Sequence, residues 1–257
     1  MKTRSHSRRN FLNYSLLGFS TAALSLASWN KQDKGNSEAA LARSDATIFI
    51  SESGNLGHDP TFTLGMLLVP QVEAFEARIQ YLRQELQYFP RLAYSNNDYF
   101  QLPFAKAAIS WVFLESAAHF RVMNFTEPIL TNHPRFGHAP SRWQVLQKKQ
   151  DYYDLLLEKE AIQNQMVYVK YQSPLGPGPI YGQHFFNKRN CYYQATDTRK
   201  SNALQLSSLL TGCVAAAYEN RLVSPIKQQI IDHLKDILES EQLQPASRWK
   251  DRFVFYA

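Results

Sequence analysis

The sequence predicts an α/β domain with a mixed sheet that opens with a β-hairpin and is flanked by helices. Short runs of β-branched and aromatic residues alternate with longer segments of helical periodicity, and two of these runs come first with only a turn between them. The chain has 257 residues, of which 44% are apolar, so it can bury the core of one such domain. We expect this domain to span residues 46–257.

The expected elements follow in order from the hydrophobic periodicity. Residues 46–51 and 61–69 predict the two strands of the hairpin, because the turn between them contains glycine and Asp-Pro. Further strands are expected at residues 120–125, 166–171 and 191–195. Helices are expected at residues 72–86, 104–119, 143–165, 201–220 and 225–239, so that the chain would end in helices.

The first 27 residues indicate an export signal. Residues 7–12 (SRRNFL) resemble the twin-arginine motif, and the apolar residues 14–27 that follow are too few and too polar for a membrane span of about 20 apolar residues. Export by this route implies a bacterial, periplasmic protein that meets the twin-arginine translocase already folded. An uncleaved signal that tethers the protein to the membrane, and an amphipathic helix with chance arginines, are the alternatives.

Polar residues 28–45 lack apolar periodicity and are interpreted as a linker. The formal net charge of +6 depends on the signal, because Lys2, Arg4, Arg8 and Arg9 all lie in it. Without them, the 28 basic residues fall to 24, against 22 acidic ones. So small an excess does not favour nucleic acid or an anionic membrane as a partner, although nucleic acid stays possible.

The predicted first strand ends in residues 51–57 (SESGNLG), the late helix carries residues 204–212 (LQLSSLLTG), and residues 197–201 (DTRKS) lie just before that helix. These three segments resemble a bacterial family catalogued as domain of unknown function 3800. Asp98 occupies the place of an acidic segment of the family between them. The resemblance covers residues 47–220.

The resemblance implies a ribonuclease H-like fold, in which acidic side chains from the first strand, the sheet centre and a late helix converge on divalent metal. Ser51 and Ser208 stand where the family has aspartate, and a neutral hydroxyl is a poor Mg²⁺ ligand. Together with the export signal, the resemblance therefore implies an exported ribonuclease H-like protein that is catalytically degenerate and holds no cofactor. We expect Ser51, Ser53, Asn55 and Ser208 to line one cleft.

The alternative is a metal-dependent phosphodiester hydrolase, a nuclease that uses Mg²⁺ or Mn²⁺ with a reduced carboxylate set of Glu52, Asp98 and Asp197. Each carboxylate also has a structural interpretation. Glu52 can belong to a tight turn with Gly54, Asp98 can be a solvated loop residue, and Asp197 can cap the following helix.

Other candidates for chemistry are weaker. His133 and His138 would suit zinc, but no third ligand has a matching spacing, so a surface loop is favoured. The tyrosine pairs 152–153 and 192–193 could stack on bases, although half-buried positions explain them better. Cys191 and Cys213 are expected to be buried thiols, with a disulfide in an oxidising compartment as the alternative.

Overall fold

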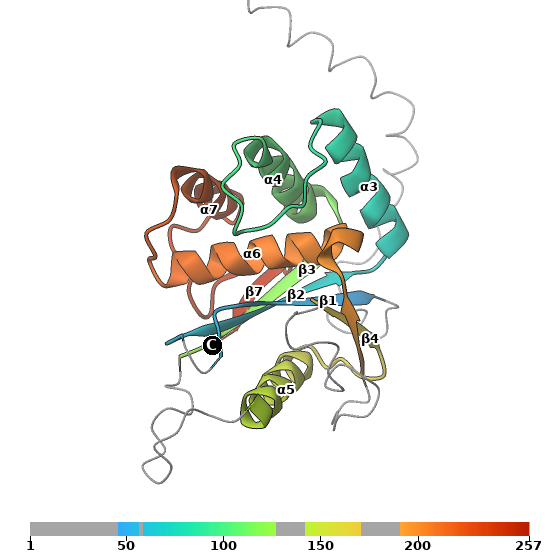
Figure 1. Cartoon of the computed structure of the whole chain (residues 1–257), viewed down its shortest axis with the longest axis vertical. Helices are drawn as coiled ribbons and strands as arrows, with labels where there is room; N and C mark the ends of the chain where they lie inside the picture. The colour runs from blue at the N-terminus through green and yellow to red at the C-terminus, as the bar shows by residue number, and fades with distance from the viewer. Residues whose placement is uncertain (1–45, 57–58, 127–141, 171–190, 257) are drawn as a thin grey trace, which may run out of the picture. The chain divides into compact units, whose positions relative to one another are not determined.

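A computed structural model describes residues 46–56, 59–126, 142–170 and 191–256 (Figure 1). The predicted export signal, the predicted linker, the loop with His133 and His138, and the glycine- and proline-rich residues 174–179 lie outside these described residues.

A mixed sheet forms the centre of the domain, as the sequence predicts, and the described residues form seven strands of it rather than the five expected. Its strands are β1 (Thr47–Ser53), β2 (Phe62–Val69), β3 (His119–Phe125), β4 (Met166–Lys170), β5 (Tyr192–Thr196), β6 (Arg248–Trp249) and β7 (Phe253–Tyr256). Their order is β5-β4-β1-β2-β3-β7-β6. β1, β2 and β3 are antiparallel neighbours, β4 is parallel to β1, β5 to β4 and β7 to β3.

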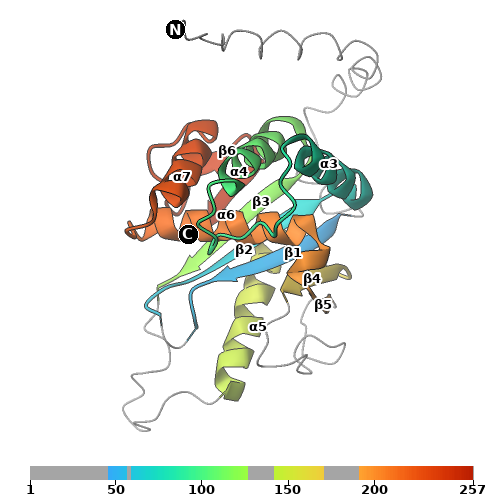
Figure 2. The same ribbon diagram turned by 45° about the horizontal axis from the view of Figure 1, so that its top comes forward.

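Helices cover both faces of the sheet. They are α3 (Val72–Glu85), α4 (Gln101–Ser110), α5 (Arg142–Lys159), α6 (Asn202–Tyr218) and α7 (Pro225–Ile237). In Figure 1, α6 lies directly on the sheet with α3, α4 and α7 outside it, and α5 covers the other face. Figure 2 shows the same separation of α5 from α6 from another side.

Two hydrophobic cores result, one on each face of the sheet. Phe49 of β1 belongs to the core under α6, whereas its neighbours Ile48 and Ile50 belong to the core under α5. Every residue of β2 is buried. The central strands therefore have two dry faces, as continuous apolar strands covered by helices on both sides must.

Helix α6 approaches the sheet very closely at Gly65 of β2. A Cβ atom at this position would overlap the Thr211 hydroxyl and lie 2.8 Å from the ring of Phe120. Gly212 is equally confined, since a side chain there would overlap Tyr94. The missing side chain of Gly65 lets α6 lie closer to the strands than a larger residue would allow, and that of Gly212 makes room for the Tyr94 ring.

Most predicted elements are observed with small shifts of their ends. The helix expected at residues 104–119 begins at Gln101 and ends after a π-helical turn (Trp111–Glu115). His119, which was expected in this helix, is the first residue of β3. α5 ends at Lys159, six residues before its expected end, because Ala161 and Asn164 have positive φ and stop the helix. Cys191 and Cys213 are both free and buried, as expected.

The prediction that the chain ends in helices is wrong, because β6 and β7 follow α7. The strand β7 has the sequence FVFY with three buried residues, so it shows no alternation of apolar and polar residues. A run of four apolar residues is too short for periodicity to identify it.

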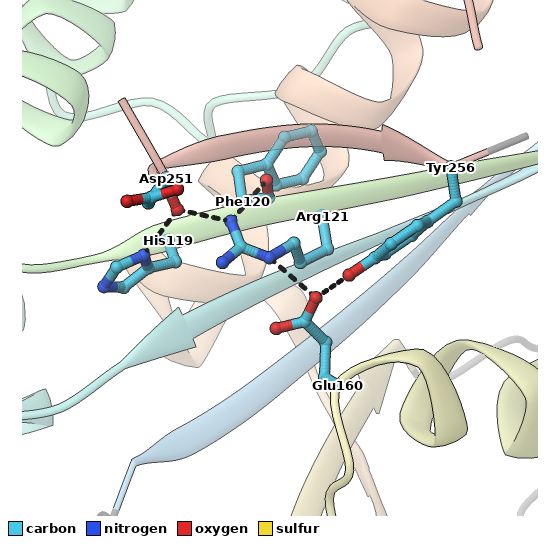
Figure 3. A network of polar contacts seen from close by, with 6 residues as sticks. All are labelled: His119, Phe120, Arg121, Glu160, Asp251 and Tyr256. Carbon is cyan, nitrogen blue, oxygen red and sulfur yellow. Dashed lines mark hydrogen bonds and ion pairs between the residues drawn. The ribbon is translucent and has the colours of Figure 1, made fainter. Parts of the chain in front are cut away.

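A buried polar network ties β7 and the residue after α5 to β3 (Figure 3). Nε of Arg121 donates to Glu160 Oε1 at 2.8 Å, and the Tyr256 hydroxyl donates to the same carboxylate oxygen. Nη1 of Arg121 donates to the Asp251 carbonyl oxygen at 2.8 Å, and His119 Nδ1 lies 2.9 Å from that oxygen. The ion pair is the counter-charge that lets Arg121 stay 4% exposed.

Gly65→Ala should destabilise the domain by about 1–3 kcal/mol, because the new methyl group overpacks the contact with α6. Adding Thr211→Ala should recover part of this loss by making room for the methyl group. Urea unfolding of the wild type, both single variants and the double variant gives the coupling energy. Strictly additive effects would mean that the two residues do not touch.

Glu160→Gln should cost about 3–5 kcal/mol in the free energy of unfolding, because it leaves the buried Arg121 without a counter-charge. Replacing Arg121 and Glu160 together by methionine should cost less than the single change. The matched control is Glu85→Gln at an exposed carboxylate of α3. Equal unfolding midpoints for Glu160→Gln and Glu85→Gln would contradict the role of the ion pair.

Candidate functional site

Three hydroxyl groups meet where β1 passes under α6. Ser51 Oγ lies 2.9 Å from Ser207 Oγ and 2.6 Å from Thr211 Oγ1. Both partners lie on one side of α6, four residues apart, and reach the sheet at the point that Gly65 leaves open. Ser51 is 1% exposed, and Ser207 and Thr211 are fully buried. We refer to Ser51, Ser207 and Thr211 as the hydroxyl cluster.

The hydroxyl cluster is satisfied by the protein itself. Thr211 donates to the Ser207 carbonyl oxygen at 2.7 Å, and Ser207 donates to the Phe49 carbonyl oxygen at 3.2 Å. These assignments leave the Ser51 proton for Thr211 Oγ1, so each hydroxyl has an acceptor for its single proton. The cluster is neutral and dry. It supplies neither the charge nor the access to water that a divalent cation requires.

The resemblance put Ser208 opposite Ser51, and the described contacts of Ser51 are with the neighbouring Ser207 and with Thr211 instead. Ser208 is partly exposed, whereas Ser207 is fully buried. One residue on a helix is a rotation of about 100°, so the two serines face different surroundings. Ser207 therefore takes the position against β1 that was expected for Ser208.

Glu52 faces the other side of the sheet. One of its carboxylate oxygens lies 2.6 Å from Nζ of Lys149, and the other accepts from the Tyr153 hydroxyl. Both partners lie on α5, and the Glu52 side chain is 7% exposed. Consecutive strand residues point to opposite faces, and β1 is flanked by β2 and β4, so the sheet separates Glu52 from the hydroxyl cluster.

Asp98 and Asp197 each serve a local turn. Asp98 accepts from the backbone N–H of Phe100 at 3.0 Å, just before α4. Asp197 caps the 3₁₀ turn Thr198–Lys200 rather than α6, whose N-cap is Ser201. Hydrogen bonds from Arg199 lower the pKa of Asp197 to about 2.

The structure does not bring the three carboxylates of the predicted hydrolase together. Glu52 is bound on the α5 face, while Asp98 and Asp197 bind groups of their own turns. In the part of the chain that the structure describes, no group of three histidine, cysteine, aspartate or glutamate side chains is placed to hold a metal ion.

The remaining residues of the predicted cleft form the end of β1 and its turn. Ser53 is still in the strand, and Gly54 takes a φ of +88°, which fits the predicted turn. The backbone N–H of Asn55 donates to the Asp59 carboxylate at 2.6 Å. These contacts account for the Gly-Asn sequence as turn chemistry.

A serine–histidine pair that the sequence did not indicate joins α4 to α7. Ser110 Oγ lies 2.9 Å from Nε2 of His233, but the same nitrogen lies 3.1 Å from the Lys106 carbonyl oxygen. A carbonyl only accepts, so Nε2 carries the proton and cannot take one from Ser110. The pair is a structural bridge between two helices and not a nucleophile with its base.

The tyrosine pairs are likewise structural where the structure describes them. Tyr152 and Tyr153 are buried on α5, and Tyr193 is buried beside Asp154, whose carboxylate lies 3.2 Å from its hydroxyl. Burial raises the pKa of Tyr193, and the nearby Asp154 charge adds to the shift. These rings offer no exposed faces on which bases could stack.

None of the helices that the structure describes is long and apolar enough to cross a membrane. No protein-family model matches the sequence, and no curated protein matches it. A role for the domain is therefore inferred from the contacts described above.

Proposed function

We propose that this chain is an exported ribonuclease H-like protein whose metal site has been lost, so that it acts without phosphodiester hydrolysis. The observation that carries the proposal is the hydroxyl cluster. At the crossing of β1 and α6, where the resemblance expects carboxylates around a metal ion, the chain has three neutral hydroxyls, and those of Ser207 and Thr211 lie within hydrogen-bond distance of Ser51 Oγ.

The sheet order supports the ribonuclease H-like part of the proposal. β1, β2 and β3 are antiparallel, β4 and β5 extend the sheet parallel to β1 on its other side, and the late helix α6 follows β5. This succession is similar to that of ribonuclease H-like sheets. β7 and β6 would then be an addition at the β3 edge.

The chemistry of the cluster supports the loss of metal. Hydrolysis of a phosphodiester by metal ions requires a site that holds Mg²⁺ or Mn²⁺, activates water and stabilises the leaving oxygen. A serine in place of aspartate removes one negative charge, and two such replacements remove most of the attraction for a cation. The full burial of Ser207 and Thr211 also keeps substrate away from this point.

A metal-dependent nuclease built on Glu52, Asp98 and Asp197 is the second candidate. It would require Glu52 to leave its contacts with Lys149 and Tyr153 on the α5 face and to reach the other two carboxylates. Breaking a buried ion pair costs several kcal/mol, so this rearrangement has little to offset it.

The purified protein should not bind Mg²⁺ or Mn²⁺ in calorimetric titrations, and its melting temperature should not rise in their presence. It should leave single-stranded, double-stranded and hybrid nucleic acid uncut. Ser51→Asp combined with Ser207→Asp, which puts carboxylates at the two positions that face each other, should bind Mn²⁺ better than the wild type. Repulsion between the added carboxylates should make this variant less stable without metal.

The control for the added charge is Ser51→Asn combined with Ser207→Asn, which adds a similar volume and no charge. It should show no response to Mn²⁺. Cleavage by the wild type that depends on Mn²⁺, and that Glu52→Gln abolishes, would reject the proposal in favour of the second candidate. This measurement needs no engineered site, so it decides the matter even where the aspartate variant does not fold.

Replacing Arg8 and Arg9 together by lysine should keep the protein in the cytoplasm. The charge is unchanged, but lysine cannot reproduce the planar, forked donor set of arginine that we expect the export receptor to read. Cell fractionation measures the exported share. Lys2→Arg combined with Arg4→Lys is the matched control and should be exported normally; equal export of both variants would count against a twin-arginine signal.

A further inference from the structure

A basic pocket of about 490 Å³ lies between the loop after α3 and the turn that leads into α6. Four cations line it: Arg83, Arg91, Arg199 and Lys200. No carboxylate is among its lining residues. Its volume is in the range of about 300–1,000 Å³ that is usual for small-molecule sites.

Arg83 is the fixed part of this pocket. Nε donates to Asn202 at 2.8 Å, Nη2 to Gln205 at 2.9 Å, and Nη1 to the carbonyl oxygens of Tyr88 and Pro90 at 3.2 and 2.7 Å. All four acceptors are neutral, and the residue is 5% exposed. Burial lowers the pKa of Arg83. The pocket wall therefore holds a buried positive charge that its hydrogen bonds orient without neutralising.

Gln205 fixes both walls of the pocket. Its side-chain oxygen accepts from Arg83 and from the backbone N–H of Leu92 at 2.7 Å, and its amide nitrogen donates to the Thr198 carbonyl oxygen at 2.8 Å. It is 4% exposed. One buried amide thus joins the loop after α3, the 3₁₀ turn and the start of α6. Its hydrogen bonds hold in place the backbone segments that carry the cations.

The adjoining carboxylates do not balance the four cations. Glu76 binds the backbone N–H groups of Asn202 and Ala203, so the N-terminus of α6 already has its anion and is not the site. Asp197 pairs with Arg199 at 2.6 Å. Among the described residues, no ion pair is formed by Arg83, Arg91 or Lys200. An excess of positive charge therefore faces the pocket.

We propose that this pocket binds a small anion that carries at least two negative charges, such as a diphosphate or a polycarboxylate. Arg91 and Lys200 supply adjustable contacts at the exposed rim, and Arg83 supplies a fixed charge in the wall. Phe89, which is 62% exposed, adds an apolar surface at the same rim. The proposal goes beyond the loss of the metal site and does not depend on it.

The test is calorimetric titration of the purified protein with pyrophosphate, citrate and ADP, in buffer with EDTA and at constant ionic strength. At least one of the three should bind, and the same compound should raise the melting temperature. Arg91→Gln combined with Lys200→Gln should weaken that binding about tenfold or more, because each change removes a charge-assisted hydrogen bond to the anion. Both residues are exposed, so the double variant should keep its fold.

Arg248→Gln combined with Lys250→Gln is the matched control, since it removes the same charge at β6, at the opposite edge of the sheet from β5. It should leave binding unchanged. An equal loss in both double variants would mean non-specific attraction and overturn the site. Binding of none of the three compounds, or binding only of a single-stranded oligonucleotide, would also overturn it. EDTA removes divalent metal, so failure here says nothing against the lost metal site.

Discussion

The close contact between α6 and the strands β1 and β2 is the constraint on which the rest of the domain depends. At Gly65 the helix lies so near that no side chain fits beneath it, and the hydroxyl cluster fills the adjoining space. α3, α4 and α7 in turn pack in the core that α6 shares with the sheet. The position of α6 therefore sets both the outer helix layer and the loops at its N-terminus.

Successive side chains of β1 point to opposite faces of the sheet, and this alternation determines which polar groups face α6. Ser51 and Glu52 are neighbours in sequence, but a strand sends them to opposite faces, one to α6 and the other to α5. A carboxylate at residue 51 would point at the late helix; the carboxylate that the chain does have, at residue 52, pairs with Lys149 instead. The acidic residue left in this segment thus stabilises the contact between sheet and α5.

Sequence reasoning identified the elements whose signals are local. The hairpin, α3, α6 and α7 came from periodicity and turn residues that lie side by side in the chain. The contacts of Glu52 with Lys149 and of Arg83 with Asn202 join residues 97 and 119 positions apart, and no local pattern encodes them. Ser207 lies against β1 in place of Ser208, because the resemblance that indicated Ser208 does not determine which of two neighbouring serines on a helix faces the strand. β7 was not predicted because a run of four apolar residues is too short to show the periodicity of a strand or of a helix.

α6 presents two different environments along its length. In its middle, the hydroxyl cluster is neutral, dry and internally satisfied, so an ion placed there would lose its hydration without gaining charged ligands. At its N-terminus, Glu76 and the buried Arg83 are both held close to Asn202, and exposed cations stand beside them. Recognition of a charged ligand requires groups that water and the ligand can reach. In the described part of this domain, the basic pocket beside the N-terminal end of α6 meets that requirement and the crossing with β1 does not.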